Sequence, residues 1–408
     1  MFDASGRDNN TYNVDNFEFI KKTSPVVGGF IEKEYYRQKN NVELIASENY
    51  CSEAVLAACG SCLSWKYAEG YPYVRTSGNT SRYYGGTEFV DQLEEYCCDV
   101  WRKVFDTDYH VNVQPHSGSQ ANFAAYKSIL KPGDTILSLS LDNGGHLTHG
   151  SSVNFSGTLY NMVFYDVDER GYIDMEDVRK KALACRPQLI LTGASAYSRT
   201  IDFPAFAEIA KEVGAYFMVD MAHIAGLVAG GAHPSPFGYA DIITTTTHKT
   251  LRGPRGGLIF ARQDLAKKVD SAVFPYAQGG PLEHIIAGKA VCAEEALRPS
   301  YKEYVHQVVK NCKALSDEFI RLGYKVVTGG TDNHLILLDL SDEPFSGRVL
   351  QEECNKNCVP CEKRSPRETS GVRIGTAPMT TRGYLEEDFV RVVHRIDELI
   401  KKLREEYK

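Results

Sequence analysis

Short apolar segments alternate with helical patterns along residues 56–290, and this alternation constrains the fold more than any other feature of the chain. Parallel strands need helical crossovers of this kind, whereas strands joined by hairpins do not. The sequence therefore predicts an α/β fold in which a mainly parallel sheet has helices on both faces. The expected strands lie at 111–113, 135–137, 189–192, 216–219, 241–245 and 258–260, with helices such as 119–130 and 204–213 between them.

Three parts are expected along the chain. Residues 1–55 are predicted to form an N-terminal arm with a helix near 27–37, and residues 56–290 a large domain. Residues 291–408 are predicted to form a smaller C-terminal α+β domain. Two long amphipathic helices at 281–297 and 300–322, strands near 324–327, 334–340 and 371–375, and a final helix at 385–405 are expected.

Charge and apolar content argue against two classes of function. The formal net charge is −7 and no long basic block occurs, so a nucleic-acid partner is not expected. No apolar segment reaches transmembrane length and the first residues lack a secretory-signal pattern, so no membrane partner is expected either. The eleven cysteines are odd in number and scattered, which favours a reducing, cytoplasmic location.

The candidate chemistry centres on Lys249, which lies among polar residues and glycines in the run Thr244–Arg255. Asp220 ends an earlier strand-like run. A lysine amine can form a Schiff base with the aldehyde of pyridoxal phosphate (PLP), and an aspartate can pair with its pyridinium nitrogen. Two unit charges about 4 Å apart at an effective dielectric near 20 interact by roughly 4 kcal/mol, an upper estimate that suffices to keep the ring protonated. The alternative, a solvated surface lysine, is common for a lysine considered alone.

A phosphate site is expected where a strand leads through Ser117, Gly118 and Ser119 into a helical pattern. Free amides and hydroxyls at a helix N-terminus, together with the helix dipole, favour phosphate binding. The alternative is a serine that only caps the helix. Beside a candidate Schiff-base lysine, the phosphate interpretation is the better one.

Other candidate contacts follow neighbouring strands, where α/β folds place their sites. Gly144 and Gly145 would let the imidazole of His146 approach a flat ring, while His149 fits a structural role. Ser195 is a candidate to hydrogen-bond a ring oxygen, and His223 is a candidate cofactor contact or a residue that supports one.

Substrate groups are expected from two further segments. Arg373 is flanked by small residues and an apolar strand, and its guanidinium could bind a carboxylate through two hydrogen bonds, although most arginines are only surface charge. The loop that contains Tyr67, Glu69 and, further on, Tyr84 combines aromatic hydroxyls with one acid, which suits general acid–base chemistry. A structural aromatic cluster would explain the tyrosines but not Glu69 so well.

The cysteines Cys354, Cys358 and Cys361 have the spacing with which radical enzymes hold an iron–sulfur cluster. They lie at the end of a late helical segment, far from the first strand of any barrel, and chance explains the spacing better in a chain with eleven cysteines. No metal site is therefore predicted.

Over residues 42–384 the chain resembles serine hydroxymethyltransferase, a fold-type I PLP-dependent transferase. Several motifs occur in the family's order, which makes coincidence implausible. They are Glu43-Leu-Ile-Ala-Ser-Glu-Asn-Tyr50, Lys66-Tyr-Ala-Glu-Gly-Tyr-Pro72, Gln114-Pro-His-Ser-Gly-Ser-Gln-Ala-Asn122, Gly144-Gly-His-Leu-Thr-His-Gly150, Val219-Asp-Met-Ala-His223, Thr244–Arg255 and Gly329-Gly-Thr-Asp-Asn-His334.

The resemblance implies a seven-stranded, mainly parallel sheet and a role for each matching residue. Lys249 would be the Schiff-base lysine, Asp220 would bind the pyridine nitrogen, and His146 would stack on the ring. The phosphate would be held by Ser117, Gly118, Ser119 and Gly280, with Ser195, His223, Thr246 and His248 as further cofactor contacts. Ser47 and Arg373 would take the amino-acid carboxylate, Glu69 would be the acid–base residue, and Tyr67 and Tyr84 would line the site.

The implied reaction transfers the hydroxymethyl carbon of serine to tetrahydrofolate and leaves glycine. The family builds its site across a homodimer, in which Tyr67, Glu69 and Gly280 arrive from the neighbouring subunit, and dimers can pair into a tetramer.

Two segments depart from the family: nine residues, Tyr73 to Ser81, lengthen the loop before Arg82, and Cys361-Glu-Lys-Arg-Ser-Pro366 differs from the loop that helps to hold the pterin. The altered loop motivates two alternatives, a folate-independent, threonine-type β-hydroxy-amino-acid aldolase and an α-methylserine hydroxymethyltransferase. A non-catalytic PLP-binding or scaffold protein is the alternative of another class.

Overall fold

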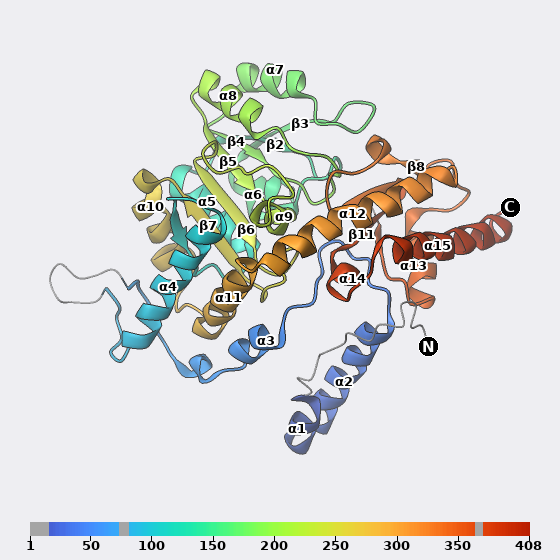
Figure 1. Ribbon diagram of the computed structural model, residues 1–408. Helices are drawn as coiled ribbons and strands as arrows, with labels where there is room; N and C mark the ends of the chain where they lie inside the picture. The colour runs from blue at the N-terminus through green and yellow to red at the C-terminus, as the bar shows by residue number, and fades with distance from the viewer. Residues whose placement is uncertain (1–15, 73–80, 364–369) are drawn as a thin grey trace.

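The computed structural model describes residues 16–72, 81–363 and 370–408, and its strands form two sheets (Figure 1). The larger sheet has seven strands in the order β1-β7-β6-β5-β4-β2-β3. These strands are β1 His110–Asn112, β2 Thr135–Leu139, β3 Asn161–Tyr165, β4 Leu189–Thr192, β5 Tyr216–Asp220, β6 Ile242–Thr246 and β7 Gly257–Ala261. The predicted seven-stranded, mainly parallel sheet is therefore confirmed.

The central strands are apolar along their whole length because both faces of the sheet are covered. In β4, Ile190 packs into one core, while Leu189 and Leu191 pack into the core on the opposite face. The first core includes side chains of α4 (Glu88–Val104), α7 (Met175–Cys185), α8 (Phe203–Val213) and α11 (Glu283–Ala296). The second includes side chains of α5 (Gly118–Ile129) and α10 (Ala266–Ser271). Helices thus cover both faces, as the alternating pattern predicts.

Strand β7 runs antiparallel to both of its neighbours, β6 and β1. Only residues 247–256 connect β6 to β7, and this connection is too short to hold the crossover that a parallel pair requires. The chain therefore turns back at the end of β6. This turn contains His248 and Lys249, which places them at the edge of the sheet where the parallel strands end.

The smaller sheet has four strands in the order β10-β11-β9-β8, all paired antiparallel. These strands are β8 Lys325–Val326, β9 Leu335–Asp339, β10 Glu362–Lys363 and β11 Gly371–Gly375. Its core includes side chains of α12 (Pro299–Arg321), α13 (Gly347–Lys356) and α15 (Glu386–Glu406). Val42 and Leu44, from the N-terminal part of the chain, complete the same core. Residues before the large sheet therefore help to stabilise the second one.

Helices α1 (Asn16–Thr23) and α2 (Pro25–Asn40) lie beside each other and project from the body of the molecule (Figure 1). Several of their apolar side chains are exposed, namely Phe19, Val26, Val27, Phe30 and Ile31. The other α-helices of the described residues are α3 Glu53–Cys59, α6 Phe155–Leu159, α9 Ala225–Ala229 and α14 Ala377–Thr381. Among the residues that the structure describes, no helix is both long and apolar enough to cross a bilayer.

The helices expected near 27–37, 281–297, 300–322 and 385–405 are present as α2, α11, α12 and α15. Strands β3 and β10 were not expected from the sequence. Strand β3 is the last strand at one edge of the large sheet and, in the part of the chain that the structure describes, pairs only with β2. Of the two departures from the family, residues 73–80 and 364–366 lie outside the described residues.

Candidate active site

A cavity of about 630 Å³ opens at the carboxyl ends of the parallel strands of the large sheet. Its wall includes the residues that follow β2, β4, β5 and β6 and the N-terminus of α5. This is the edge at which α/β sheets bind ligands. The predicted residues in its lining are Ser47, Ser117, Gly118, Ser119, His146, Ser195, Asp220, His223, Thr246, His248, Lys249 and Arg373.

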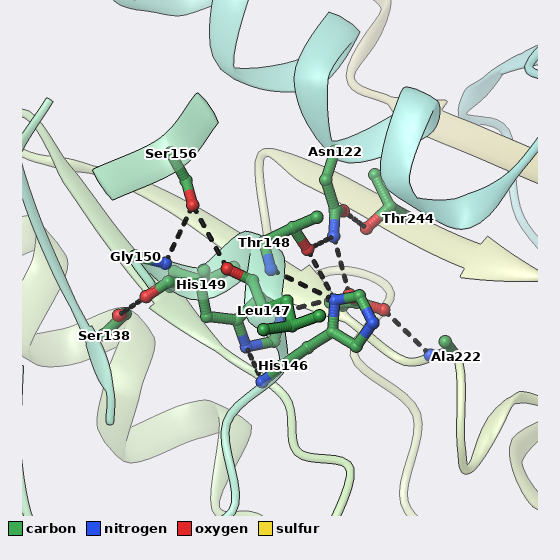
Figure 2. Close-up of polar contacts among 12 residues, drawn as sticks. Asn122, Ser138, His146, Leu147, Thr148, His149, Gly150, Ser156, Ala222 and Thr244 are labelled. Carbon is green, nitrogen blue, oxygen red and sulfur yellow. Dashed lines mark hydrogen bonds and ion pairs between the residues drawn. The ribbon is translucent and has the colours of Figure 1, made fainter. Parts of the chain in front are cut away.

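Asp220, the last residue of β5, is held by several hydrogen bonds. Its Oδ2 accepts from Asn122 Nδ2 at 2.8 Å and is 3.0 Å from His149 Nε2, and its Oδ1 accepts from the backbone of Ala222. Figure 2 shows Asn122, His149 and Ala222 in this network, with Thr148 and Thr244 beside Asn122. Burial alone would raise the pKa of Asp220, but His149, His146 and Asn122 together hold it well below its ordinary value. Asp220 therefore remains a carboxylate at neutral pH.

Lys249 lies in the turn after β6 and is buried in the wall of the same cavity. Burial lowers the pKa of Lys249 to about 8, while the charge of Asp220 acts in the opposite direction. A large fraction of the amine is therefore neutral near pH 8, as a nucleophilic lysine requires. The backbone of this turn is fixed by Asn49, whose side chain donates to the Lys249 carbonyl at 2.9 Å.

The start of α5 fits a phosphate group. The side chain of Ser117 caps the helix by accepting from Gln120 N at 3.3 Å, so the capping role considered from the sequence is observed. A Cβ on Gly118 would lie 2.6 Å from Thr246 Cγ2, so a side chain at position 118 would collide with β6. Thr246 Oγ1 and His248 Nδ1 are buried and have no hydrogen-bond partner within the described part of the chain. Buried polar atoms without a partner, beside a helix N-terminus, are suited to hydrogen-bond an anionic ligand.

His146 lies over the cavity because the backbone before it folds tightly. Gly144 has a φ of 107°, and a Cβ there would lie 2.4 Å from the Ala196 carbonyl oxygen. His146 Nδ1 lies 2.8 Å from Thr148 Oγ1, which orients the ring (Figure 2). Burial, followed by the charge of His149, lowers the pKa of His146 to about 4, so its ring is neutral. A neutral flat ring is well suited to lie against a heterocycle.

His223 also lines the cavity and stacks against His334, with ring centroids 5.4 Å apart. Its Nδ1 is 3.2 Å from His334 Nε2. Burial, with the charge of Lys249, lowers the pKa of His223 well below its ordinary value. Burial likewise lowers the pKa of His334 to about 3, so both imidazoles stay neutral.

The guanidinium of Arg373 reaches the cavity from β11 of the smaller sheet. It donates to the carbonyl of Ser195 and to the carboxylate of Glu362. Ser47 Oγ is 3.5 Å from the other carboxylate oxygen of Glu362. The two groups expected to take a substrate carboxylate therefore lie together, and both contact an acidic side chain of the same chain.

The other predicted site residues gather in a second cluster, which does not line the Lys249 cavity of the same chain. The rings of Tyr67 and Tyr84 lie 4.8 Å apart, and a Cβ on Gly280 would lie 3.0 Å from Tyr67 Cε1. Desolvation and the nearby carboxylate of Glu69 raise the pKa of the Tyr84 hydroxyl. We call Tyr67, Glu69, Tyr84 and Gly280 the tyrosine cluster. Within one subunit it is separate from Lys249.

Sequence reasoning missed three residues of the cavity. Asn122 and His149 hold Asp220, and Glu362 holds Arg373. His149 was assigned a structural role, and its only sequence signal is its place three residues after His146. Within the described ranges, no group of three or more histidine, cysteine or acidic side chains is arranged to hold a metal ion.

The fold and cavity together define an α/β protein of the enzyme type, with a buried lysine and a carboxylate at the ends of adjacent parallel strands and the N-terminus of α5 beside them. A family model described as serine hydroxymethyltransferase matches residues 20–396. The chain therefore belongs to the serine hydroxymethyltransferase family and has the fold-type I architecture.

This membership makes the protein a PLP-dependent one-carbon transferase, with tetrahydrofolate as co-substrate. It supports the transfer of the serine hydroxymethyl carbon to tetrahydrofolate, with glycine as the other product. The match does not favour a folate-independent aldolase, an α-methylserine enzyme or a non-catalytic PLP-binding protein over this activity.

Proposed function

We propose that the cavity around Lys249 is where serine is converted to glycine. The observation that carries this proposal is that Asp220 and Lys249 line one cavity from adjacent strands, with the N-terminus of α5 in the same wall. A charge-stabilising carboxylate, a nucleophilic amine and an anion site are the three groups that PLP needs.

We propose the following cofactor contacts. The phosphate group would be held at the start of α5 and the end of β6, by Ser117, Gly118, Ser119, Thr246 and His248. Thr246 Oγ1 and His248 Nδ1, which have no hydrogen-bond partner within the described residues, support this assignment. Asp220 would bind the pyridine nitrogen, while His146, Ser195 and His223 would contact the ring. When bound, PLP supplies electron withdrawal through its protonated ring. The network around Asp220 would keep the carboxylate charged and correctly placed for that purpose.

The substrate contacts are proposed at the opposite side of the cavity. Arg373 and Ser47 would bind the carboxylate of serine or glycine, because a guanidinium and a hydroxyl form charge-assisted hydrogen bonds with it. Lys249 Nζ, with its lowered pKa, would accept and return a proton during the exchange of amines. Glu69 of the partner subunit would take the proton of the serine hydroxyl, and Tyr67 and Tyr84 would flank it.

We propose that the enzyme is a homodimer with shared active sites. The tyrosine cluster lacks access to the Lys249 cavity of its own chain, so it would complete the cavity of a second subunit. The exposed apolar side chains of α1 and α2 support this assembly, because a partner subunit would cover them. Pairing of dimers into a tetramer is compatible with the same contacts.

The cytoplasm is the compartment that we propose. All eleven cysteines lie within the described ranges and are free thiols, which suits a reducing environment.

We also propose that residues 1–55, 56–290 and 291–408 act as an arm, a large domain and a small domain. The separate cores of the two sheets support this division.

The test is a serine-to-glycine assay with and without tetrahydrofolate. We expect glycine and methylenetetrahydrofolate to form at equal rates. The Lys249→Ala variant should form neither. If serine or threonine is turned over as fast without tetrahydrofolate as with it, the proposal is contradicted and an aldolase is favoured.

A further inference from the structure

Glu362 and Arg373 are direct partners across a pair of strands. Strand β10 pairs antiparallel with β11, and the register sets Glu362 opposite Arg373. Side chains of directly opposed residues leave the sheet on the same face and contact each other. Arg373 Nε donates to Glu362 Oε2 at 2.9 Å, and the terminal nitrogen of the guanidinium contacts the same oxygen. The backbone therefore holds this carboxylate at the guanidinium.

The Glu362 carboxylate contacts both groups that we assign to the substrate carboxylate. One of its oxygens receives the Arg373 hydrogen bonds, and the other lies 3.5 Å from Ser47 Oγ. A third contact of the guanidinium, from Nη1, is with the Ser195 carbonyl. A carboxylate arriving at Arg373 would thus meet a guanidinium whose Nε–Nη2 edge already binds a carboxylate.

The pair is placed so that it can open. The Arg373 side chain is 10 % exposed, whereas that of Glu362 is 29 % exposed. Glu362 belongs to a two-residue strand at the edge of the smaller sheet, which within the described residues pairs with β11 alone. The glutamate side chain can therefore move toward solvent while Arg373 stays fixed in the wall of the cavity.

We propose that Glu362 is an internal stand-in for the substrate carboxylate, and that its release from Arg373 sets the affinity of the enzyme for amino acids. This inference rests on the proposed role of Arg373 and Ser47. Serine and glycine bind only when their carboxylate displaces that of Glu362. Glu362 is therefore a specificity-determining residue, because it lowers the affinity for ligands whose carboxylate competes poorly for the Arg373 guanidinium.

The expected size of the effect follows from competition within one molecule. The apparent dissociation constant equals the intrinsic one divided by the fraction of enzyme in which Arg373 is free. If the closed pair is favoured about tenfold, removing the Glu362 charge should tighten glycine binding by roughly tenfold. A ligand without a carboxylate gains nothing, because it makes no use of Arg373.

The experiment measures the dissociation constants of glycine and of glycinamide with PLP-loaded full-length enzyme by calorimetry. The variants are Glu362→Gln and Glu362→Ala, the second of which also removes the hydrogen-bonding group. Glu352→Gln is the matched control, because it removes one carboxylate from an exposed position on α13, where Glu352 pairs only with Arg348 in the described structure. Arg373→Gln tests the carboxylate site itself.

Both Glu362 variants should bind glycine about tenfold more tightly, with glycinamide binding unchanged and the Glu352→Gln variant equal to wild type. An unchanged or weaker glycine affinity in both variants would overturn the role of Glu362. An equal gain for glycinamide would overturn it too, because it would indicate a general opening of the cavity. If Arg373→Gln loses glycine binding while the Glu362 variants do not change it, only the present inference fails. If Arg373→Gln binds glycine normally, the proposed substrate site itself is wrong.

Discussion

Asp220 Oδ2 lies 3.0 Å from His149 Nε2, although 71 residues separate the two in the sequence. Asn122 adds a second donor to the same oxygen, so the carboxylate is fixed from two directions. Burial would otherwise favour the neutral acid, which could not stabilise a protonated pyridine ring. The role that we propose for Asp220 therefore depends on His149 and Asn122 as much as on its own position at the end of β5.

Asp220→Asn should lower kcat for serine cleavage strongly. The amide has nearly the same shape as the carboxylate but no charge, and an interaction of roughly 4 kcal/mol corresponds to about 10³-fold in rate. Covalent attachment of PLP to Lys249 should persist, because the amine is still present. Steady-state kinetics at saturating PLP check this, and a kcat within tenfold of wild type would argue against the assigned role.

The rate of PLP capture by the apoenzyme should rise with pH and level off above about pH 8. Only the neutral amine attacks an aldehyde, and burial lowers the pKa of Lys249 to that value from 10.5. Because the charge of Asp220 raises the pKa of Lys249, Asp220→Asn should move the midpoint to lower pH. Stopped-flow absorbance over a pH series measures both midpoints. A rate that keeps rising toward pH 10 would show that the lysine is not perturbed.

Lys289→Met should destabilise the fold around the segment that leads into α5. The buried Lys289 Nζ donates to the carbonyls of Val113, Pro115 and Gly257 at 2.7, 3.0 and 2.9 Å. Methionine would remove these three hydrogen bonds, at a cost of about 3–5 kcal/mol in the free energy of unfolding, although the Pro115 carbonyl also accepts from Gly257 N. Urea unfolding of the holoenzyme measures this. Lys302→Met, at an exposed position, is the control, and equal stability of the two variants would refute the prediction.

Mixed dimers test whether the tyrosine cluster serves a second subunit. Lys249→Ala and Glu69→Gln homodimers should each lose most turnover, the second by about 10²–10⁴-fold. After unfolding and refolding an equal mixture, half of the dimers should be mixed and should each hold one intact site. About a quarter of wild-type activity should then return. Activity no higher than that of the separate variants would indicate that Glu69 acts within its own chain.

The sequence was sufficient for the parts of the site that are local. Asp220, Ser117–Ser119 and Lys249 each lie where a strand ends, and strand ends can be recognised from apolar runs followed by glycine or polar residues. Parallel strands end at the same edge, so these residues were expected to converge, and they line one cavity.

Other features depended on pairing between distant segments. The contact of Glu362 with Arg373 exists because β10 pairs with β11 across a loop, and a two-residue strand has no periodic pattern to reveal it. Similarly, Asn122 meets Asp220 across 98 residues of sequence. Strand β3 lies at the sheet edge beside β2 and is mostly only partly buried, so it lacks the continuous buried run of the central strands.

The most direct measurement of the central claim is the site of covalent PLP attachment. Borohydride reduction of the holoenzyme fixes PLP to its lysine, and mass spectrometry of a digest then identifies the modified peptide. The account predicts the added pyridoxyl phosphate mass on Lys249 alone. Modification of a different lysine, such as the buried Lys289, with Lys249 unmodified, would contradict it.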